Sequence, residues 1–284
     1  MARQRHRHKK TYYNDIALRL AEQLLGLKHL HFGYFDEGDQ IKLSTLPHAQ
    51  EVYAQQLLGF VPQDVHRILD VGCGSGGMAK VLVQHGYEVT CIAPDPYLIQ
   101  KTLENTSGKV TTCTDLYENV RDLPPGYFDL ILMSESCQYV KVKEGWEQNS
   151  KYLRPGGYVL VSDFFKLREI ARPNISKSGH MLDAYLQAAD EQGYVLMTKT
   201  DITERVAPTM DIYNDLIQTK LFPVEEALAE FLYRRYPFLS KSVQLVFGKK
   251  ISNLKEKYSN QSSEVFRQYK GYFILLFQKR RFKN

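Results

Sequence analysis

The sequence has few of the features that mark secreted, metal-binding or membrane-spanning proteins. Its 284 residues include four cysteines, Cys73, Cys91, Cys113 and Cys137, and none of them forms a CxxC pair. This spacing suggests neither a zinc site nor a disulfide framework, so we expect reduced thiols and no bound metal. The longest apolar runs, such as Tyr272–Phe277, are far shorter than the about 20 residues that span a bilayer. No signal-peptide core stands near the start, so we expect a soluble, cytoplasmic protein.

No internal repeat and no low-complexity tract is present either. Hydrophobic residues make up 43% and charged residues 24% of the chain, which is typical of a globular protein. A chain of 284 residues is long enough for one large domain or for a domain that carries a sizeable insertion.

The positive charge is concentrated at the two ends. The first ten residues, "MARQRHRHKK", and the last seven, "QKRRFKN", are basic and contain no acid. Such ends can bind nucleic acid or an anionic membrane, but they are more often solvated and disordered. We therefore expect a disordered basic tail over residues 1–11. The body between the ends is close to neutral, which disfavours a nucleic-acid partner.

From Arg67 onward, short β-branched runs alternate with stretches of helical periodicity. "GGMAKVLVQHG" and "DAYLQAADEQG" repeat apolar residues at helical spacing and end on Gly, which stops a helix. The predicted strands cover Arg67–Val71, Glu88–Ile92, Lys109–Cys113, Phe128–Met133, Gly157–Ser162, Tyr194–Asp201 and Gly271–Lys279. Strands that alternate with helices imply an α/β fold with a doubly wound, mostly parallel sheet.

Two regions fall outside this alternation. Residues 12–65 are expected to form an N-terminal helical cap segment around "HLHFGYFDEG". Residues 204–268 are also helical in pattern and interrupt the last two strands. An insertion of this length is too long for a plain connection, so we expect a lid over the site. The α/β core then comprises residues 66–203 and 269–284.

A glycine-rich turn, "ILDVGCGSGG", ends the first predicted strand and opens a helix. Gly72, Gly74 and Gly76 let the backbone turn tightly and approach a ligand closely. With Gly77 the turn also satisfies GxGxxG, so a dinucleotide site is formally allowed. Asp70 argues against it, because an acid beneath the loop suits a ligand with a positive charge and an amino group and repels a pyrophosphate. Alternatively, Asp70 only stabilises the loop, by accepting hydrogen bonds from the backbone of its own turn.

The pattern D-x-G-x-G-x-G, formed here by Asp70, Gly72, Gly74 and Gly76, resembles the first motif of class I S-adenosylmethionine-dependent methyltransferases. "TCTDLYE", "YFDLILMSESCQYV" and "YLRPGGYVLVSDFF" resemble later segments of that family in order and spacing. The resemblance implies a Rossmann-like, seven-stranded sheet with an antiparallel last strand, and S-adenosylmethionine as cofactor with S-adenosylhomocysteine as product. Within the family the chain resembles the small-molecule group that contains tocopherol, rebeccamycin-sugar and cyclopropane-fatty-acid enzymes.

The resemblance also implies which residues hold the cofactor. Tyr34 would close over it, and Asp115 would lie near the adenine amino group, although Asp115 could instead cap a helix. The full expected cofactor set is Tyr34, Asp70, Gly72, Gly74, Gly76, Ala93, Asp95, Asp115, Leu116 and Ser134.

The ribose contact is the one departure from the family pattern. The usual acid at the end of the second strand is replaced by Ala93, and the glutamine that some members carry five residues later is replaced by Leu98. Asp95 or Gln100 must then bind the ribose, or backbone amides and water do. Asp95 could equally be the N-cap of the helix that starts at Pro96.

"SESCQYV" resembles the acceptor loop of the family, so Glu135, Gln138 and Tyr139 are candidate catalytic or positioning residues, against the alternative of an ordinary polar loop. His31 and His180 are candidate bases because histidine titrates near neutrality, although a lone histidine is more often structural. The predicted function is methyl transfer to a small molecule, with the acceptor atom open. The alternatives are a nucleic-acid methyltransferase, a nicotinamide-dependent oxidoreductase, and a binding protein of the same fold without activity.

Overall fold

The computed structural model describes residues 31–169, 178–238 and 262–280, and between the last two ranges also residues 240, 241, 244, 245, 248, 249 and 252. The sequence-predicted tail over residues 1–11 and the first part of the cap segment lie outside these residues.

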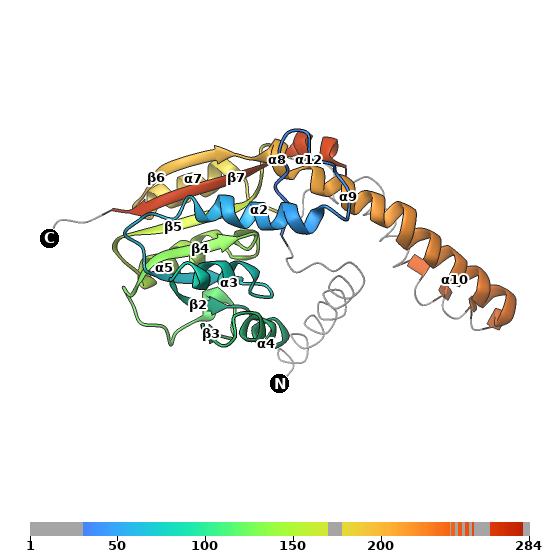
Figure 1. The fold of residues 1–284 in the computed structure, drawn as a ribbon, viewed down its shortest axis with the longest axis horizontal. Coiled ribbons are helices and arrows are strands. Elements are labelled where there is room, and N and C mark those ends of the chain that lie inside the picture. The colour runs from blue at the N-terminus through green and yellow to red at the C-terminus, as the bar shows by residue number, and fades with distance from the viewer. Residues whose placement is uncertain are drawn as a thin grey trace.

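The described chain is built around a seven-stranded sheet in the order β3-β2-β1-β4-β5-β7-β6 (Figure 1). The strands are β1 (Arg67–Val71), β2 (Glu88–Ile92), β3 (Thr111–Cys113), β4 (Phe128–Ser134), β5 (Leu153–Lys166), β6 (Tyr194–Asp201) and β7 (Lys270–Lys279). The pairs among β1 to β5 are parallel, whereas β7 runs antiparallel to both β5 and β6. The predicted α/β sheet with an antiparallel last strand is therefore confirmed.

Three predicted strands match the structure to the residue, and two differ clearly. The strand predicted from Lys109 begins only at Thr111, because Gly108 has a φ of 70° and the Lys109 N–H is bonded back to Thr106 O in a turn. The strand predicted as Gly157–Ser162 extends over Leu153–Lys166. Its extra length comes from β7, whose antiparallel ladder pairs with β5 as far as Lys166.

Strand residues alternate between two hydrophobic cores, one on each face of the sheet. On β4, Ile131 and Met133 belong to one core, whereas Leu130 and Leu132 belong to the other. All residues of β4 except Ser134 are buried, as expected for a central strand that helices cover on both faces.

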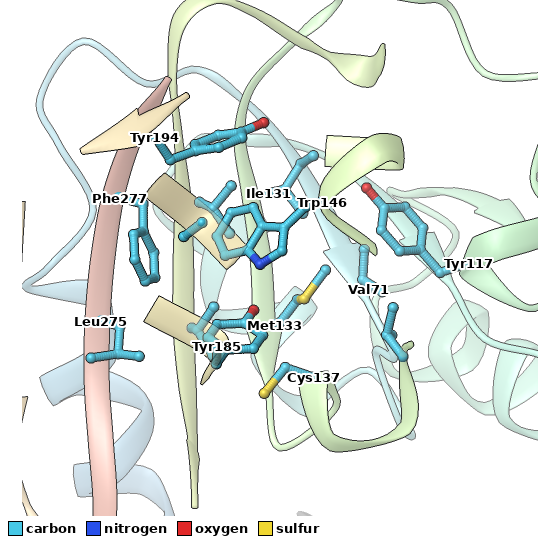
Figure 2. Close-up of a cluster of buried hydrophobic side chains, with 14 of the residues drawn as sticks. Val71, Tyr117, Ile131, Met133, Cys137, Trp146, Tyr185, Tyr194, Leu275 and Phe277 are labelled. Atoms are coloured by element: carbon cyan, nitrogen blue, oxygen red, sulfur yellow. The ribbon is translucent and has the colours of Figure 1, made fainter. Parts of the chain in front are cut away.

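The first core lies beneath α5 (Val142–Tyr152) and α7 (Leu182–Glu191). Trp146 is at its centre (Figure 2), with ring centroids 4.7 Å from Tyr194, 5.1 Å from Phe277 and 5.3 Å from Tyr185. These contacts bring together α5, α7, β6 and β7, so the edge of the sheet far from the glycine loop is held by aromatic packing.

The second core lies beneath the helices α2 (Leu46–Leu58), α3 (Gly77–Gln84) and α4 (Pro96–Asn105). The helix α3 begins directly after the glycine turn, so its N-terminus is held at the carboxyl end of β1. Asp95 is the N-cap of α4, and Pro96 follows it at the first helical position.

The described part of the segment predicted as a lid, residues 204–268, is largely helical, but parts of it belong to the core. It contains α8 (Thr203–Val206), α9 (Pro208–Leu216), a π-helical turn (Ile217–Leu221), α10 (Phe222–Arg235) and α12 (Ser263–Tyr269). Val206, Ala207, Ile212 and Phe266 from this segment are buried in the hydrophobic cores.

The helices α9 and α10, joined by the π-helical turn, form one continuous arm that projects from the sheet (Figure 1). Pro223 does not interrupt this arm, because it stands in the first turn of α10. None of the residues of α10 is buried. In the described ranges, no helix is both long enough and apolar enough to cross a membrane.

The cap segment is not helical throughout, which corrects the sequence prediction. Residues 32–45 contain no regular helix ahead of α2. Here the N–H of Phe32 donates to Glu135 Oε1, that of Gly33 to Thr209 Oγ1, and that of Tyr34 to Ala49 O. These amides donate to other parts of the fold and not to the carbonyl groups four residues earlier, as they would in a helix. Residues 32–45 therefore form an irregular segment, which we call the strap.

Candidate cofactor and acceptor site

A cavity of about 440 Å³ opens at the carboxyl ends of β1, β2 and β4. Open α/β sheets place their ligands at this edge, and the volume lies within the range of about 300–1,000 Å³ that is usual for small-molecule sites. The residues that line it are His31, Asp70, Gly72, Cys73, Gly74, Ser75, Gly77, Met78, Ala93, Pro94, Leu98, Ser134, Glu135, Ser136, Gln138 and Tyr139.

The glycine turn forms one wall of the cavity. Gly72, Gly74 and Gly76 have φ values of 77°, 57° and 84°, in the left-handed region that favours glycine. A Cβ on Gly72 would lie 2.4 Å from Cβ of Ser136, and one on Gly76 would lie 2.8 Å from Cα of Thr102. The glycines are therefore needed both for the turn and for close packing, although Gly76 itself does not line the cavity.

Asp70 lies at the end of β1 beneath this turn. Its side chain is buried, and its Oδ2 has no hydrogen-bond partner. Burial raises the pKa of Asp70 to about 7. An unpartnered carboxylate in this position costs free energy unless a ligand supplies a donor, and it favours one that carries a positive charge.

Glu135 also lines the cavity, in the loop that follows β4. Its backbone has a φ of 53°, which is uncommon for a residue other than glycine and is often found at functional sites. Its Oε1 accepts bonds from Phe32 N–H at 2.6 Å and from the Tyr272 hydroxyl at 2.8 Å. Burial raises the pKa of Glu135 to about 8, although the bond from Phe32 opposes the shift.

A network of buried hydroxyl groups supports Glu135. The hydroxyl of Tyr53, on α2, lies 2.8 Å from the Tyr272 hydroxyl and donates to Ser162 Oγ at 2.7 Å. It also lies 3.2 Å from Oγ of Ser134, which lines the cavity. The His31 ring stacks on the Tyr53 ring with centroids 4.5 Å apart. One network thus joins the strap, α2, β4, β5 and β7 beside the cavity.

Gln138 and Tyr139 both line the cavity, in the 3₁₀ turn Cys137–Tyr139. Gln138 is held by Asp163, which accepts its backbone N–H at 3.2 Å and its side-chain Nε2–H at 3.3 Å. Asp163 is fully buried within β5, where it pairs with Phe273 of β7. Tyr139 is 77% exposed, so it lies at the rim of the cavity.

On the β2 side, the cavity is lined by Ala93, Pro94 and Leu98. Asp95 is not one of the lining residues: its Oδ1 accepts the Tyr97 N–H at 2.9 Å and so caps α4. Its Oδ2 is buried without a hydrogen-bond partner. The cap role is therefore observed, and the ribose contact remains a prediction.

Three more residues of the predicted cofactor set lie outside the cavity lining. The Tyr34 ring packs against the core beneath α2 and α3. Asp115 Oδ1 accepts the N–H of Leu116, whose side chain is 40% exposed. His180, a candidate base, has its Nε2 2.9 Å from Cys137 O and 3.0 Å from Val140 O, so it braces the loop after β4.

Sequence reasoning missed Asp163, Tyr53, Tyr272 and Ser162. Only Asp163 carried a usable signal, because it is an acid two residues after the apolar run Tyr158–Val161, toward the edge of the sheet where ligands bind. Within the described ranges, no group of three or more His, Cys, Asp and Glu side chains is placed to hold a metal ion.

Residues 46–207, more than half of the chain, match the family described as methyltransferase domain. The chain belongs to this methyltransferase family. It is 25% identical over 183 residues to phosphoethanolamine N-methyltransferase 3 of Arabidopsis thaliana, covering 58% of this chain and 35% of that one. It is 26% identical over 142 residues to 2-methyl-6-phytyl-1,4-hydroquinone methyltransferase of Synechocystis sp., covering 48% and 44%. The chain thus spans less than half the length of these two relatives.

Solved structures share the fold of this methyltransferase-family chain across most of its length. Geranyl diphosphate C-methyltransferase from Streptomyces coelicolor, solved with Mg²⁺, a thiolodiphosphate and S-adenosyl-L-homocysteine, has a TM-score of 0.66 at 17% identity, covering 92% of this chain and 91% of that one. The cyclase SpnF has a TM-score of 0.67 at 15% identity, covering 93% and 95%. At these identities the likeness concerns the fold alone. The predicted family and its Rossmann-like fold are confirmed.

Proposed function

We propose that this chain transfers a methyl group from S-adenosylmethionine to a small molecule. The observation that carries the proposal is the Asp70 carboxylate, buried in the cavity beneath the glycine turn with its Oδ2 unpartnered. S-adenosylmethionine carries an amino group and a positively charged sulfonium, so a lone carboxylate suits it. The pyrophosphate of a nicotinamide dinucleotide would be repelled by the same group, which disfavours the oxidoreductase alternative.

The lining residues fit this cofactor. Asp70 would accept hydrogen bonds from its amino group, and the turn at Gly72 and Gly74 would allow the backbone to approach it without a Cβ in the way. Ala93, Pro94 and Leu98 offer an apolar wall on the β2 side. When bound, S-adenosylmethionine supplies a methyl group on a sulfonium, which is electrophilic without further activation.

The protein's task is then mainly to align the acceptor and to exclude water. A base is needed only for an acceptor that loses a proton. Glu135 is our candidate. Its Oε1 is bonded to Phe32 and Tyr272, whereas its Oε2 has no hydrogen-bond partner among the described residues. With a pKa raised to about 8, Glu135 has the basicity to take a proton near neutral pH.

Glu135→Gln tests this role. The amide oxygen still accepts the bonds from Phe32 and Tyr272, so the fold and cofactor binding should survive while a group that can take a proton is lost. We expect turnover to fall by about 100-fold or more. Wild-type turnover should rise with pH, reach half of its maximum near pH 8 and level off about one pH unit higher, because the carboxylate form is the active one. Full activity of the variant would show that Glu135 only positions the strap.

The acceptor is proposed to be a small molecule. Relatives are named for phosphoethanolamine and for a phytyl hydroquinone, so the family covers polar and lipid-like acceptors. Tyr139 at the rim and the apolar side chains of the α10 arm would suit an acceptor with an apolar part. A nucleic-acid acceptor is disfavoured because no Lys or Arg lines the described part of the cavity.

The remaining parts of the proposal concern closure and location. Tyr34 and the α9–α10 arm are proposed to close over the bound cofactor, since Leu221, Val224 and Phe231 are each more than half exposed and closure would bury them. The four cysteines carry free thiols, which is consistent with the proposed cytoplasmic location. Cell fractionation tests the location.

Calorimetry with S-adenosylmethionine, S-adenosylhomocysteine and NAD tests the cofactor directly. Binding of the first two and not of NAD is expected; the reverse would overturn the proposal. Incubating the protein with deuteromethyl-labelled cofactor and a metabolite extract, followed by mass spectrometry, then identifies the labelled product. Cofactor binding without any product, across extracts from several sources, would favour a binding protein of this fold.

A further inference from the structure

The lining of the cavity is acidic. Asp70 and Glu135 carry carboxyl groups, and no Lys or Arg stands among the described lining residues. A third carboxyl group, that of Asp163, lies directly behind Gln138. An anionic group at the reacting end of an acceptor would therefore lie among three carboxyl groups and find no Lys or Arg side chain among the described lining residues to pair with.

The side-chain amide of Gln138 has only one favourable orientation. Asp163 Oδ2 accepts the Gln138 backbone N–H, and Asp163 Oδ1 accepts both the Phe164 backbone N–H at 2.8 Å and Gln138 Nε2–H. Turning the amide over would place its oxygen against a carboxylate, replacing an attraction by a repulsion. Asp163 therefore holds the amide so that Nε2 faces the carboxylate.

This orientation leaves Oε1 of Gln138 without a hydrogen-bond partner among the described residues, on a side chain that lines the cavity. An amide oxygen accepts hydrogen bonds but is far too weak a base to take a proton. Gln138 can thus recognise a donor on a bound molecule without deprotonating it.

We propose that Gln138, oriented by Asp163, selects an uncharged or cationic acceptor whose reacting nitrogen or oxygen carries a hydrogen, which donates to Gln138 Oε1. The inference rests on the proposed methyltransferase function and narrows its substrate class to N–H and O–H compounds such as amines and phenols. Phosphates and carboxylates at the reacting end are disfavoured, because the described lining offers them carboxyl groups and no Lys or Arg. Gln138 is then the specificity residue, and Asp163 is a positioning residue.

Three fragments of similar size test the selection: phenol, anisole and benzoate. Each is titrated into ¹⁵N-labelled protein saturated with S-adenosylhomocysteine, and binding is followed at the backbone and side-chain amide signals of Gln138. We expect phenol to bind about three- to tenfold more tightly than anisole, which lacks the donor. Benzoate should bind more weakly than phenol.

Gln138→Met is the matched variant, because methionine keeps the length of the side chain and removes the carbonyl oxygen. The preference for phenol over anisole should fall below about twofold, while the weak binding of benzoate persists. Asp163→Asn should reduce the same preference and also remove the downfield shift of the Gln138 amide protons, an effect that a merely structural role would not produce.

Equal affinity for phenol and anisole, an unchanged preference in Gln138→Met, or benzoate binding as tight as phenol would each overturn the inference. The affinity for S-adenosylhomocysteine is measured first on every variant. If it is intact, a failed fragment preference overturns only the acceptor class. If the wild-type protein does not bind S-adenosylhomocysteine at all, the proposed function itself fails, and the fragments are titrated into the free protein.

Discussion

Replacing Asp70 by asparagine should stabilise the free protein and weaken its cofactor binding. The substitution keeps the size of the side chain and removes a buried charge whose Oδ2 has no partner. In the free protein that charge is unfavourable, whereas in the complex it pairs with a cationic group. The two effects have opposite signs, so measuring both on one variant separates a ligand site from a loop-stabilising acid.

The stability effect follows from the pKa. Burial raises the pKa of Asp70 from 3.8 to about 7. A shift of roughly three units corresponds to about 4 kcal/mol. Because the folded-state pKa is the higher one, this penalty is absent below pH 3.8, grows as the pH rises, and is complete above about pH 7. At pH 8, Asp70→Asn should therefore be more stable than the wild type by up to about 4 kcal/mol, and the two should be equal at pH 4.

The binding effect has a linked pH dependence. At pH 7 about half of the Asp70 side chains carry a proton in the free protein, and pairing with an ammonium group releases it. Wild-type affinity for S-adenosylhomocysteine should therefore rise by about an order of magnitude between pH 5.5 and pH 7. The variant should bind at least about tenfold more weakly at pH 7, since a charged hydrogen bond contributes about 1.5–3 kcal/mol, and its affinity should not depend on pH over this range.

Denaturant unfolding at pH 4 and pH 8 measures the first effect. Calorimetry in buffers of different ionisation enthalpy measures the second, together with the number of protons released. If Asp70→Asn is less stable than the wild type at pH 8 and binds the ligand equally well, the carboxylate serves its own turn, and our assignment of the site is wrong.

Three further predictions concern the loop, the helix cap and the arm. Asp95→Ala should lose about 1 kcal/mol of stability, because the helix loses its N-cap. If Asp95 also binds the ribose, cofactor affinity should fall roughly ten- to a hundredfold. An unchanged affinity would show that Asp95 serves only as the N-cap. Gly72→Ala should lose cofactor binding, because the new Cβ would lie 2.4 Å from Cβ of Ser136. Gly86→Ala is the control: Gly86 also has a positive φ, 86°, but a Cβ there would have nothing within 4 Å, so this variant should lose only about 1–2 kcal/mol of stability from its left-handed backbone. Hydrogen exchange over residues 208–235 should slow when S-adenosylhomocysteine is added, and protection confined to the glycine turn would contradict closure of the arm.

Strand positions were predictable where local sequence decides them. β1, β2 and β6 are short segments that contain β-branched residues and lie between turns and helices, and they match to the residue. The length of β5 was not predictable, because its last residues, up to Lys166, are held by a ladder with β7 about a hundred residues later. The helical prediction failed at the strap for a similar reason: the amides of Phe32 and Gly33 bond to Glu135 and Thr209.

The site also has one half that local sequence determines and one half that depends on long-range contacts. The sequence by itself determined the half around the glycine turn, because Asp70, Gly72 and Gly74 are neighbours in the chain and a strand that ends in a tight turn places them together whatever surrounds it. Only the tertiary structure decided the acceptor half. Glu135 meets Tyr272, 137 residues away, and Gln138 meets Asp163, 25 residues away. Such contacts depend on the order and register of β4, β5 and β7 in the sheet, which long-range pairing sets and local sequence patterns do not encode.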